Sequence, residues 1–268
     1  MRTEKKKSHV GAKIAIIVII AYLLLPLIMT FIYSLFQEWI DIAPTGFTLA
    51  AYTELFTDPL FWKAVGRTVV ISIIPIILCT VFVLLAMYVV VVYHPEWDKM
   101  IQILCTIPYA IQGVILPICV LSLYSSAPEP FGDRMFMLVA TYMVVILPYV
   151  YQGIRNNLNG VGAPRLIEAA QMLGASKFYA FFRVVIPNIM GGVTISVMLA
   201  MAIVFGDFVI INTLAGGQFM TAQMYLYDVM KKSGQRTCAV IVVLFVVTLI
   251  ISACAFFLQS KEKDRKDR

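Results

Sequence analysis

The sequence has 268 residues, of which 61% are hydrophobic and 13% are charged, and its mean hydropathy is +0.89. This composition excludes an ordinary soluble domain and predicts a polytopic membrane protein in a lipid bilayer. The formal net charge of +6 is interpreted as a mark of membrane topology, and no nucleic-acid partner is expected.

Residues 1–13 form a basic segment that is expected to lie in the cytoplasm. It could contact anionic lipid and orient the chain, or it could be a solvated tail. The apolar run that follows, 14–36, is too long for the core of a signal peptide, and no clear small-residue cleavage site follows it. We therefore expect a retained first span, which tolerates Pro26 near its middle.

Apolar segments long enough to cross a bilayer recur along the chain, since a span needs roughly 20 apolar residues. An even number of spans places both ends on one side. Cytoplasmic ends put 15 of the 21 Lys and Arg residues on the inner side, in agreement with the positive-inside rule. We expect an all-α protein whose membrane domain covers 14–258 and whose charged cytoplasmic tail covers 259–268. The six expected spans are 14–36, 66–93, 100–124, 135–152, 189–211 and 237–258.

Prolines interrupt the expected spans, most notably at Pro108 and Pro117, with Gly113 between them. Such breaks can bend a helix around a translocation path and leave backbone carbonyls free to face water or a ligand. The alternative is that proline is simply common in membrane helices. Pro108 and Pro117 are therefore candidates for the path.

A polar segment, residues 155–188, separates the fourth and fifth expected spans. Proline suits the start of a helix, so the pattern predicts a helix that begins at Pro164 and stops at Gly174. Ser176 is expected to cap a second short helix over 177–185. The segment should thus form a helix, a tight turn and a helix beside the membrane.

Several residues of this segment resemble the EAA loop of permease subunits of binding-protein-dependent ABC importers. The family pattern is EAA, three residues, G, nine residues, I, one residue, LP. Val184 stands where Ile is usual and Ile186 stands where Leu is usual, and both replacements remain apolar. Pro187 completes the match and is expected to close the second helix. The residues that carry the resemblance are Glu168, Ala169, Ala170, Gly174 and Pro187, together with the replacement Ile186.

This resemblance, which extends over about residues 47–258, implies a type I importer fold. It also implies three partners: a second permease subunit, alike or different, a cytoplasmic ABC ATPase dimer, and an extracytoplasmic substrate-binding protein. The small residues of the loop would enter a groove on the ATPase, Glu168 would face a basic partner, and Leu173 or Phe178 would act as an apolar anchor. The loop residues expected at the ATPase are Glu168, Ala169, Ala170, Leu173, Gly174, Ala175, Ser176, Phe178 and Pro187.

Asp207 is a carboxylate within or near the outer end of the fifth expected span. An ionisable group inside a membrane is a candidate for function, here the translocation path. Alternatively, it lies at the outer interface and hydrates or caps a helix. Gly206-Asp207-Phe208 and Ala215-Gly216-Gly217 resemble the permease branch that handles polyamines, ferric iron, thiamine and aminophosphonates.

Patterns for other functions are missing from the sequence. Without a P-loop, the chain is not expected to cradle ATP, so hydrolysis is assigned to a partner and no cofactor is expected. His9 and His94 stand apart from any cysteine or carboxylate cluster, so no metal site is expected. A secondary transporter or channel, which would need intramembrane charge relays, and a membrane enzyme, which would need a catalytic cluster, are the alternatives.

Overall fold

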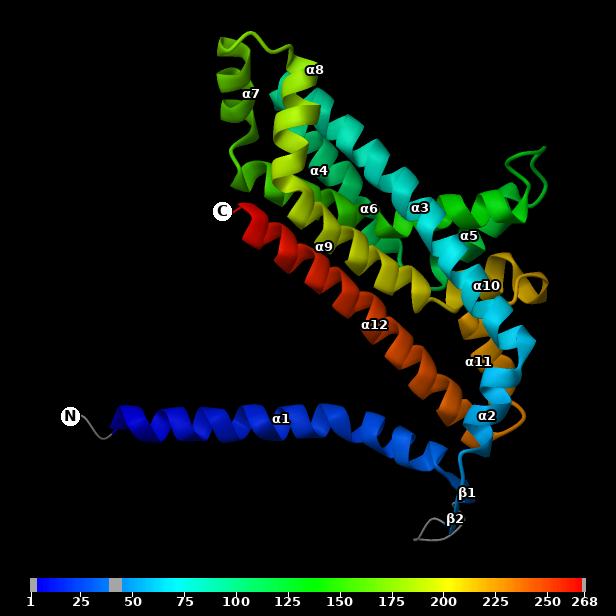
Figure 1. Cartoon of the computed structure of the whole chain (residues 1–268). Coiled ribbons are helices and arrows are strands. Elements are labelled where there is room, and N and C mark those ends of the chain that lie inside the picture. The colour runs from blue at the N-terminus through cyan, green and yellow to red at the C-terminus, as the bar shows by residue number, and fades with distance from the viewer. Residues whose placement is uncertain (1–3, 39–44, 267–268) are drawn as a thin grey trace. The chain divides into compact units, whose positions relative to one another are not determined.

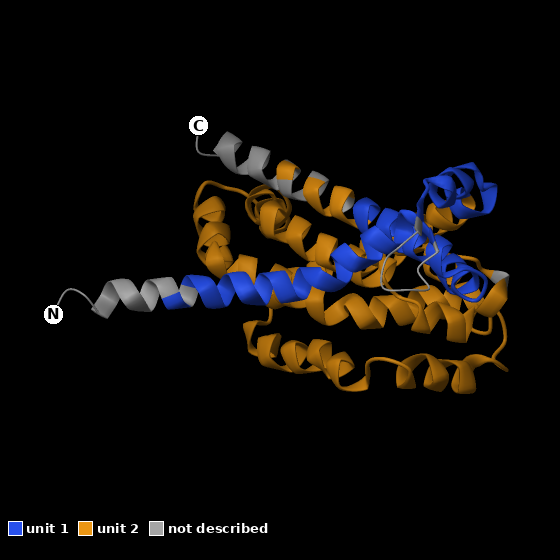
Figure 2. Cartoon of the chain, turned by 90° about the horizontal axis from the view of Figure 1, so that it is seen from below, with its two compact units in different colours: residues 1–62, 225–247 blue, residues 63–224, 248–268 orange. Residues whose placement is uncertain are grey.

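A computed structural model describes residues 4–38 and 45–266 of the chain. Helices dominate, as expected for an all-α membrane protein. The chain divides into two compact units, which are coloured in Figure 2. Unit 1 comprises residues 1–62 and 225–247, and unit 2 comprises residues 63–224 and 248–268.

Unit 1 begins with the long helix α1 (Glu4–Ser34). Two three-residue strands follow, β1 (Phe36–Glu38) and β2 (Thr45–Phe47), and they pair antiparallel. Strands this short provide little stability, so the hairpin mainly reverses the chain toward helix α2 (Ala50–Thr57). The hydroxyls of Ser34 and Tyr52 lie 2.6 Å apart and join α1 to α2.

Polar contacts hold α2 and the residue after it against the parts of α11 (Ala222–Met230) and α12 (Gly234–Lys266) that belong to unit 1. The hydroxyl of Tyr225 donates to Asp58 Oδ2 at 2.7 Å, and Arg236 forms an ion pair with Glu54. Phe61 packs on the Tyr225 ring with centroids 5.5 Å apart.

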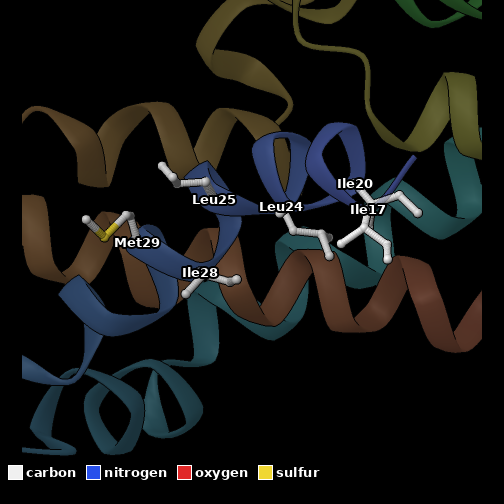
Figure 3. A pocket seen from close by; sticks show the side chains of 7 residues that line it. Ile17, Ile20, Leu24, Leu25, Ile28 and Met29 are labelled. Carbon is white, nitrogen blue, oxygen red and sulfur yellow. The ribbon is translucent and has the colours of Figure 1, made fainter. Parts of the chain in front are cut away.

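The surface of α1 is apolar from Ile14 to Phe31. Its membrane-length segment, Lys13–Ser34, buries none of its most hydrophobic window against the rest of the chain. A hollow of about 600 Å³ lies along this helix, and Figure 3 shows the side chains that line it. Such a surface suits lipid or another transmembrane helix. The hollow is lined by Ile17, Ile20, Ala21, Leu24, Leu25, Ile28 and Met29.

Unit 2 holds the middle of the chain, and Figure 1 labels most of its helices. Helix α3 (Pro59–Val92) enters from unit 1. The elements that follow it are η1 (Pro95–Trp97), α4 (Asp98–Thr106), η2 (Ile107–Ile111), α5 (Ile115–Tyr124), α6 (Arg134–Gly160), α7 (Ala163–Met172), α8 (Lys177–Tyr179), η3 (Ala180–Val185), α9 (Ile186–Phe205), α10 (Val209–Leu214) and η4 (Gly216–Gln218).

Helices α6 and α9 form the centre of unit 2, and small residues bring their backbones together. Gly153 of α6 meets Ser196 of α9, and Gly192 of α9 meets Asn157 of α6. Gly192 thus permits close packing of the two helices, whereas Gly191 has open space beside it. These contacts fix the relative position of two membrane helices.

The described residues contain four helices that are long and apolar enough to cross a membrane. A fifth apolar region is a pair of helices, Pro95–Ile111 and Ile115–Tyr124, which meet at an angle of 100°. In the region of the last expected span, the shorter apolar helix is Gly234–Ile250, the first part of α12. Apolar helices thus lie in all six expected regions, although the third is not a straight span.

Two expected spans are corrected. The expected helix over 100–124 breaks at Gly113, whose φ of +83° lies in the left-handed region that glycine adopts readily. The expected span over 189–211 ends at Phe205 because a turn through Asp207 starts the separate helix α10.

Candidate functional site

The polar segment between α6 and α9 folds into a protruding corner built from α7, α8 and the start of η3 (Figure 1). Helix α7 begins at Ala163, one residue before the expected Pro164, after Gly162 reverses the chain with a φ of +62°. Ala163 and Ile167 are buried, and α7 packs against η3. The opposite face of α7 is left exposed.

A Schellman motif ends α7 at Gly174. The N–H of Gly174 donates to the Gln171 carbonyl at 2.9 Å, and the N–H of Ala175 donates to the Ala170 carbonyl at 3.0 Å. Gly174 has a φ of +87°, which a residue with a Cβ rarely adopts. Glycine is therefore required by backbone conformation, as the sequence pattern predicted, and no neighbouring atom fills the space beside it.

Ser176 caps the next helix, as expected, because its Oγ accepts from the Tyr179 N–H at 3.2 Å. The prediction that Pro187 closes this helix is wrong. Helix α8, the π-helical turn η3 and α9 continue as one apolar run, Lys177–Phe205, in which Pro187 lies in the first turn of α9. The corner therefore leads without a break into a membrane helix.

The tip of the corner carries two very exposed apolar side chains. Met172 is 89% exposed and Leu173 is 90% exposed, which is unusual for large hydrophobic residues unless a partner covers them. Leu173 was expected here, whereas Met172 was not, because a methionine at the end of an amphipathic helix carries no distinctive pattern. Phe178 is 59% exposed but also packs its ring on Phe182, with centroids 4.4 Å apart.

The remaining predicted loop residues differ in their access to a partner. Glu168 and Ala169 are exposed on α7, and Glu168 forms no ion pair within residues 4–38 and 45–266. Ala170 and Ala175 are half-buried, which leaves a shallow surface of small residues beside the tip. Pro187 is exposed, but it lies on α9 beyond the corner.

An ion pair that the sequence did not predict joins α4 to α6. Arg155 donates from Nε to Asp98 Oδ1 at 2.9 Å and from Nη2 to Asp98 Oδ2 at 2.5 Å. The side chains of Arg155 and Asp98 are only 22% and 33% exposed. This bidentate ion pair holds the start of α4, the first helix of the bent pair, against α6.

Asp207 caps α10 through a hydrogen bond from the Ile210 N–H to its Oδ2 at 3.0 Å. The same oxygen accepts from the hydroxyl of buried Tyr142 at 3.1 Å. The capping role that the sequence left open is thus present in the structure. Pro108 lies in η2 and Pro117 is buried in α5, on either side of the bend at Gly113.

Long apolar helices joined to an exposed corner define a multi-pass membrane protein. The chain belongs to the family described as binding-protein-dependent transport system inner membrane component, which matches residues 70–261. It is accordingly a permease subunit of an ABC importer in the inner membrane. Its partners are those of the family: an ATPase, a second permease and a substrate-binding protein.

Named relatives include permeases of several transport systems. A Salmonella paratyphi A protein named as a 2-aminoethylphosphonate transport system permease, PhnV, is 24% identical over 208 residues, covering 76% of each chain. The sulfate transport system permease protein CysW of Synechocystis is 26% identical and covers 92% of this chain and 91% of the relative. The spermidine/putrescine permease PotC of Escherichia coli is 20% identical and covers 92% of each.

The fold is also similar to that of a solved transporter. A chain in the crystal structure of a bacterial ABC transporter that imports the acidic polysaccharide alginate matches with a TM-score of 0.66. The match covers 95% of this chain and 96% of that chain at 16% sequence identity. This likeness establishes the type I importer permease fold.

Proposed function

We propose that the corner formed by α7 and α8 is the site at which the cytoplasmic ATPase binds. The observation that carries this proposal is the pair of apolar side chains at the tip, Met172 and Leu173, held outward by the Schellman turn at Gly174. Apolar anchors that fill a pocket supply much of the affinity of a protein interface. Glu168 and Ala169 flank the anchors and offer a carboxylate and a flat surface.

The proposed orientation places both termini and the corner in the cytoplasm. The 15 Lys and Arg residues on that side, against a total of 21, support it through the positive-inside rule. In this arrangement the corner faces the compartment that contains ATP. The loops before α3 and after α10 then face the binding protein.

The continuous run from Lys177 to Phe205 suggests how movement is transmitted. Closure of the ATPase dimer displaces the corner, and the helix carries this displacement into α9. Because α9 packs closely on α6, both helices move together. Access to the path between the two permease subunits then alternates between the two sides of the membrane.

The proposed path includes the bend flanked by Pro108 and Pro117, together with Asp207. Half-buried Asp207 supplies a fixed carboxylate near the outer end of α9. The substrate is proposed to be a small charged solute of the polyamine, ferric iron, thiamine or aminophosphonate type. The names of the relatives, which include aminophosphonate and spermidine/putrescine systems, support this class of substrate. The sulfate permease among them extends the proposed substrates to inorganic anions.

Two substitutions test the docking site in the complete complex purified from membranes. Leu173→Asp places a charge where the apolar anchor should enter the ATPase, and Glu168→Lys reverses the flanking charge. Both should reduce the amount of ATPase that co-purifies with the permease. Glu129→Lys is the matched control, because Glu129 is also an exposed carboxylate and lies in the loop between α5 and α6, away from the corner. Normal co-purification of the ATPase with both corner variants would refute the assignment.

A further inference from the structure

Aromatic rings connect the corner to the end of α3, although Tyr88 on α3 precedes these rings by 90 positions or more in the sequence. The ring of Tyr88 on α3 lies 5.9 Å from Phe178, 5.1 Å from Phe181 and 5.8 Å from Phe182, measured between centroids. These are the distances at which aromatic rings attract one another. Tyr88 is thus the common contact of three rings on α8 and η3.

A second set of contacts extends this cluster to the end of α3. The hydroxyls of Tyr88 and Tyr93 lie 3.3 Å apart, and the two rings pack edge to face. The ammonium group of Lys177, the first residue of α8, lies 4.9 Å from the centre of the Tyr93 ring. A cation at this distance from an aromatic face is attracted to it. Helix α8 is therefore held to α3 from its first residue.

The π-helical turn η3 lies where the aromatic rings contact α3. Residues Ala180–Val185 form this wider turn between α8 and α9. Phe181 is fully buried, whereas Phe182 and Tyr88 are half-buried, so the cluster is packed on one side and open on the other. Single π-helical turns occur frequently at functional sites. The turn makes this junction distinct from the regular helices on either side.

We propose that Tyr88 is a positioning residue that transmits movement of the corner to α3. The proposal rests on the proposed function, since it requires the corner to bind the ATPase. Movement reaches α9 through the continuous helix, and it reaches α3 through the rings grouped on Tyr88. One displaced corner thereby moves two membrane helices that are distant in the sequence.

The test measures whether α3 moves when the ATPase changes its nucleotide state. The experiment uses the permease–ATPase complex with the five native cysteines replaced by alanine. A new cysteine on α3, Val89→Cys, reports movement of this helix through the rate at which it reacts with a water-soluble maleimide. The rate is compared with and without ATP plus vanadate. Tyr88→Leu should reduce the nucleotide-dependent change about two- to thirty-fold, the range expected when one coupling contact is lost. Tyr88→Phe keeps the ring and should restore the change.

The controls separate this proposal from the docking assignment. Phe82→Leu alters an exposed ring on the same helix and should leave the labelling response intact. The ATPase should still co-purify with Tyr88→Leu, because the tip is unchanged. An undiminished response in Tyr88→Leu, or loss of the ATPase from it, would overturn the transmission role. Should Tyr88→Leu fail to fold, Phe182→Leu, which alters a half-buried ring that contacts Tyr88 and has no part in the docking assignment, is read in the same way.

Discussion

Gly153 of α6 faces Ser196 of α9 so closely that a Cβ atom on the glycine would overlap the serine Oγ. The Ser196 hydroxyl in turn donates to the Gly192 carbonyl at 3.0 Å within its own helix. Contacts this close let two membrane helices gain van der Waals attraction where lipid offers no hydrophobic driving force. The α6–α9 pair is therefore sensitive to single added methyl groups.

Gly153→Ala should lower the thermal stability of the purified permease in detergent, because overpacking costs roughly 1–3 kcal/mol. Gly192→Ala should act likewise through its clash with the Asn157 amide. Gly191→Ala is the control, since nothing lies within 4 Å of its added methyl group. Combining Gly153→Ala with Ser196→Gly should recover much of the loss, and a failure to do so would argue against direct contact.

Gly174→Ala should weaken the corner through backbone strain, because the left-handed conformation costs a residue with a Cβ roughly 1–2 kcal/mol. Gly174→Asn should be milder, since asparagine tolerates this conformation. Hydrogen exchange at the amides of Gly174 and Ala175 measures the opening of the turn. Gly160→Ala provides the comparison, because Gly160 has open space and an ordinary helical conformation. Equal effects at both glycines would contradict the strain argument.

Asp98→Asn or Arg155→Gln should each destabilise the chain by about 1–2 kcal/mol, less than for a fully buried pair because water partly screens both groups. The double variant should cost less than the two single variants combined, since no charge is then left unpaired. A double-mutant cycle of thermal unfolding measures this difference. Simple additivity would show that the contact contributes nothing to stability.

Asp207→Asn should reduce uptake while leaving the fold intact, because an amide oxygen can still accept from Ile210 and Tyr142. Uptake is followed with labelled spermidine, sulfate and 2-aminoethylphosphonate, using whichever the unmodified complex imports. Tyr142→Phe keeps the charge and removes one hydrogen bond, so it should cost about 1 kcal/mol of stability and spare uptake. Unchanged uptake in Asp207→Asn would leave Asp207 with its capping role alone.

Burial, together with the hydrogen bond to Asp58, raises the pKa of Tyr225 above its ordinary value near 10. The neutral phenol is therefore favoured in the folded protein, and its contribution to stability is complete below about pH 10 and declines as the pH rises further. Thermal unfolding at pH 8 and at pH 10.5 should show this decline. The decline should be smaller in Tyr225→Phe, and equal declines in both proteins would refute the assignment.

The sequence was informative where one local rule decided the structure. Gly174 required a left-handed turn, Ser176 could cap a helix, and the apolar runs were long enough to span a membrane. Each of these features depends on neighbours within a few positions. Such features can be predicted without knowledge of the fold.

The failures arose where distant segments meet or where several structures fit one pattern. The Asp98–Arg155 pair and the ring cluster at Tyr88 join residues far apart in sequence, so no local pattern revealed them. The prediction that Pro187 ends a helix was wrong because proline fits the first turn of a helix as well as the position after its end. The bend at Gly113 was hidden because an apolar run looks alike whether it is straight or broken.

Because the run from Lys177 to Phe205 is continuous, the rotation of this helix about its axis sets the direction in which the corner points. Each residue added or removed between Ile186 and the middle of α9 would turn the tip by about 100° around the helix axis and shift it by about 1.5 Å. The number of residues in this stretch is consequently constrained more tightly than the identity of each residue. A permease of this design can change its side chains here more freely than it can change its count of residues.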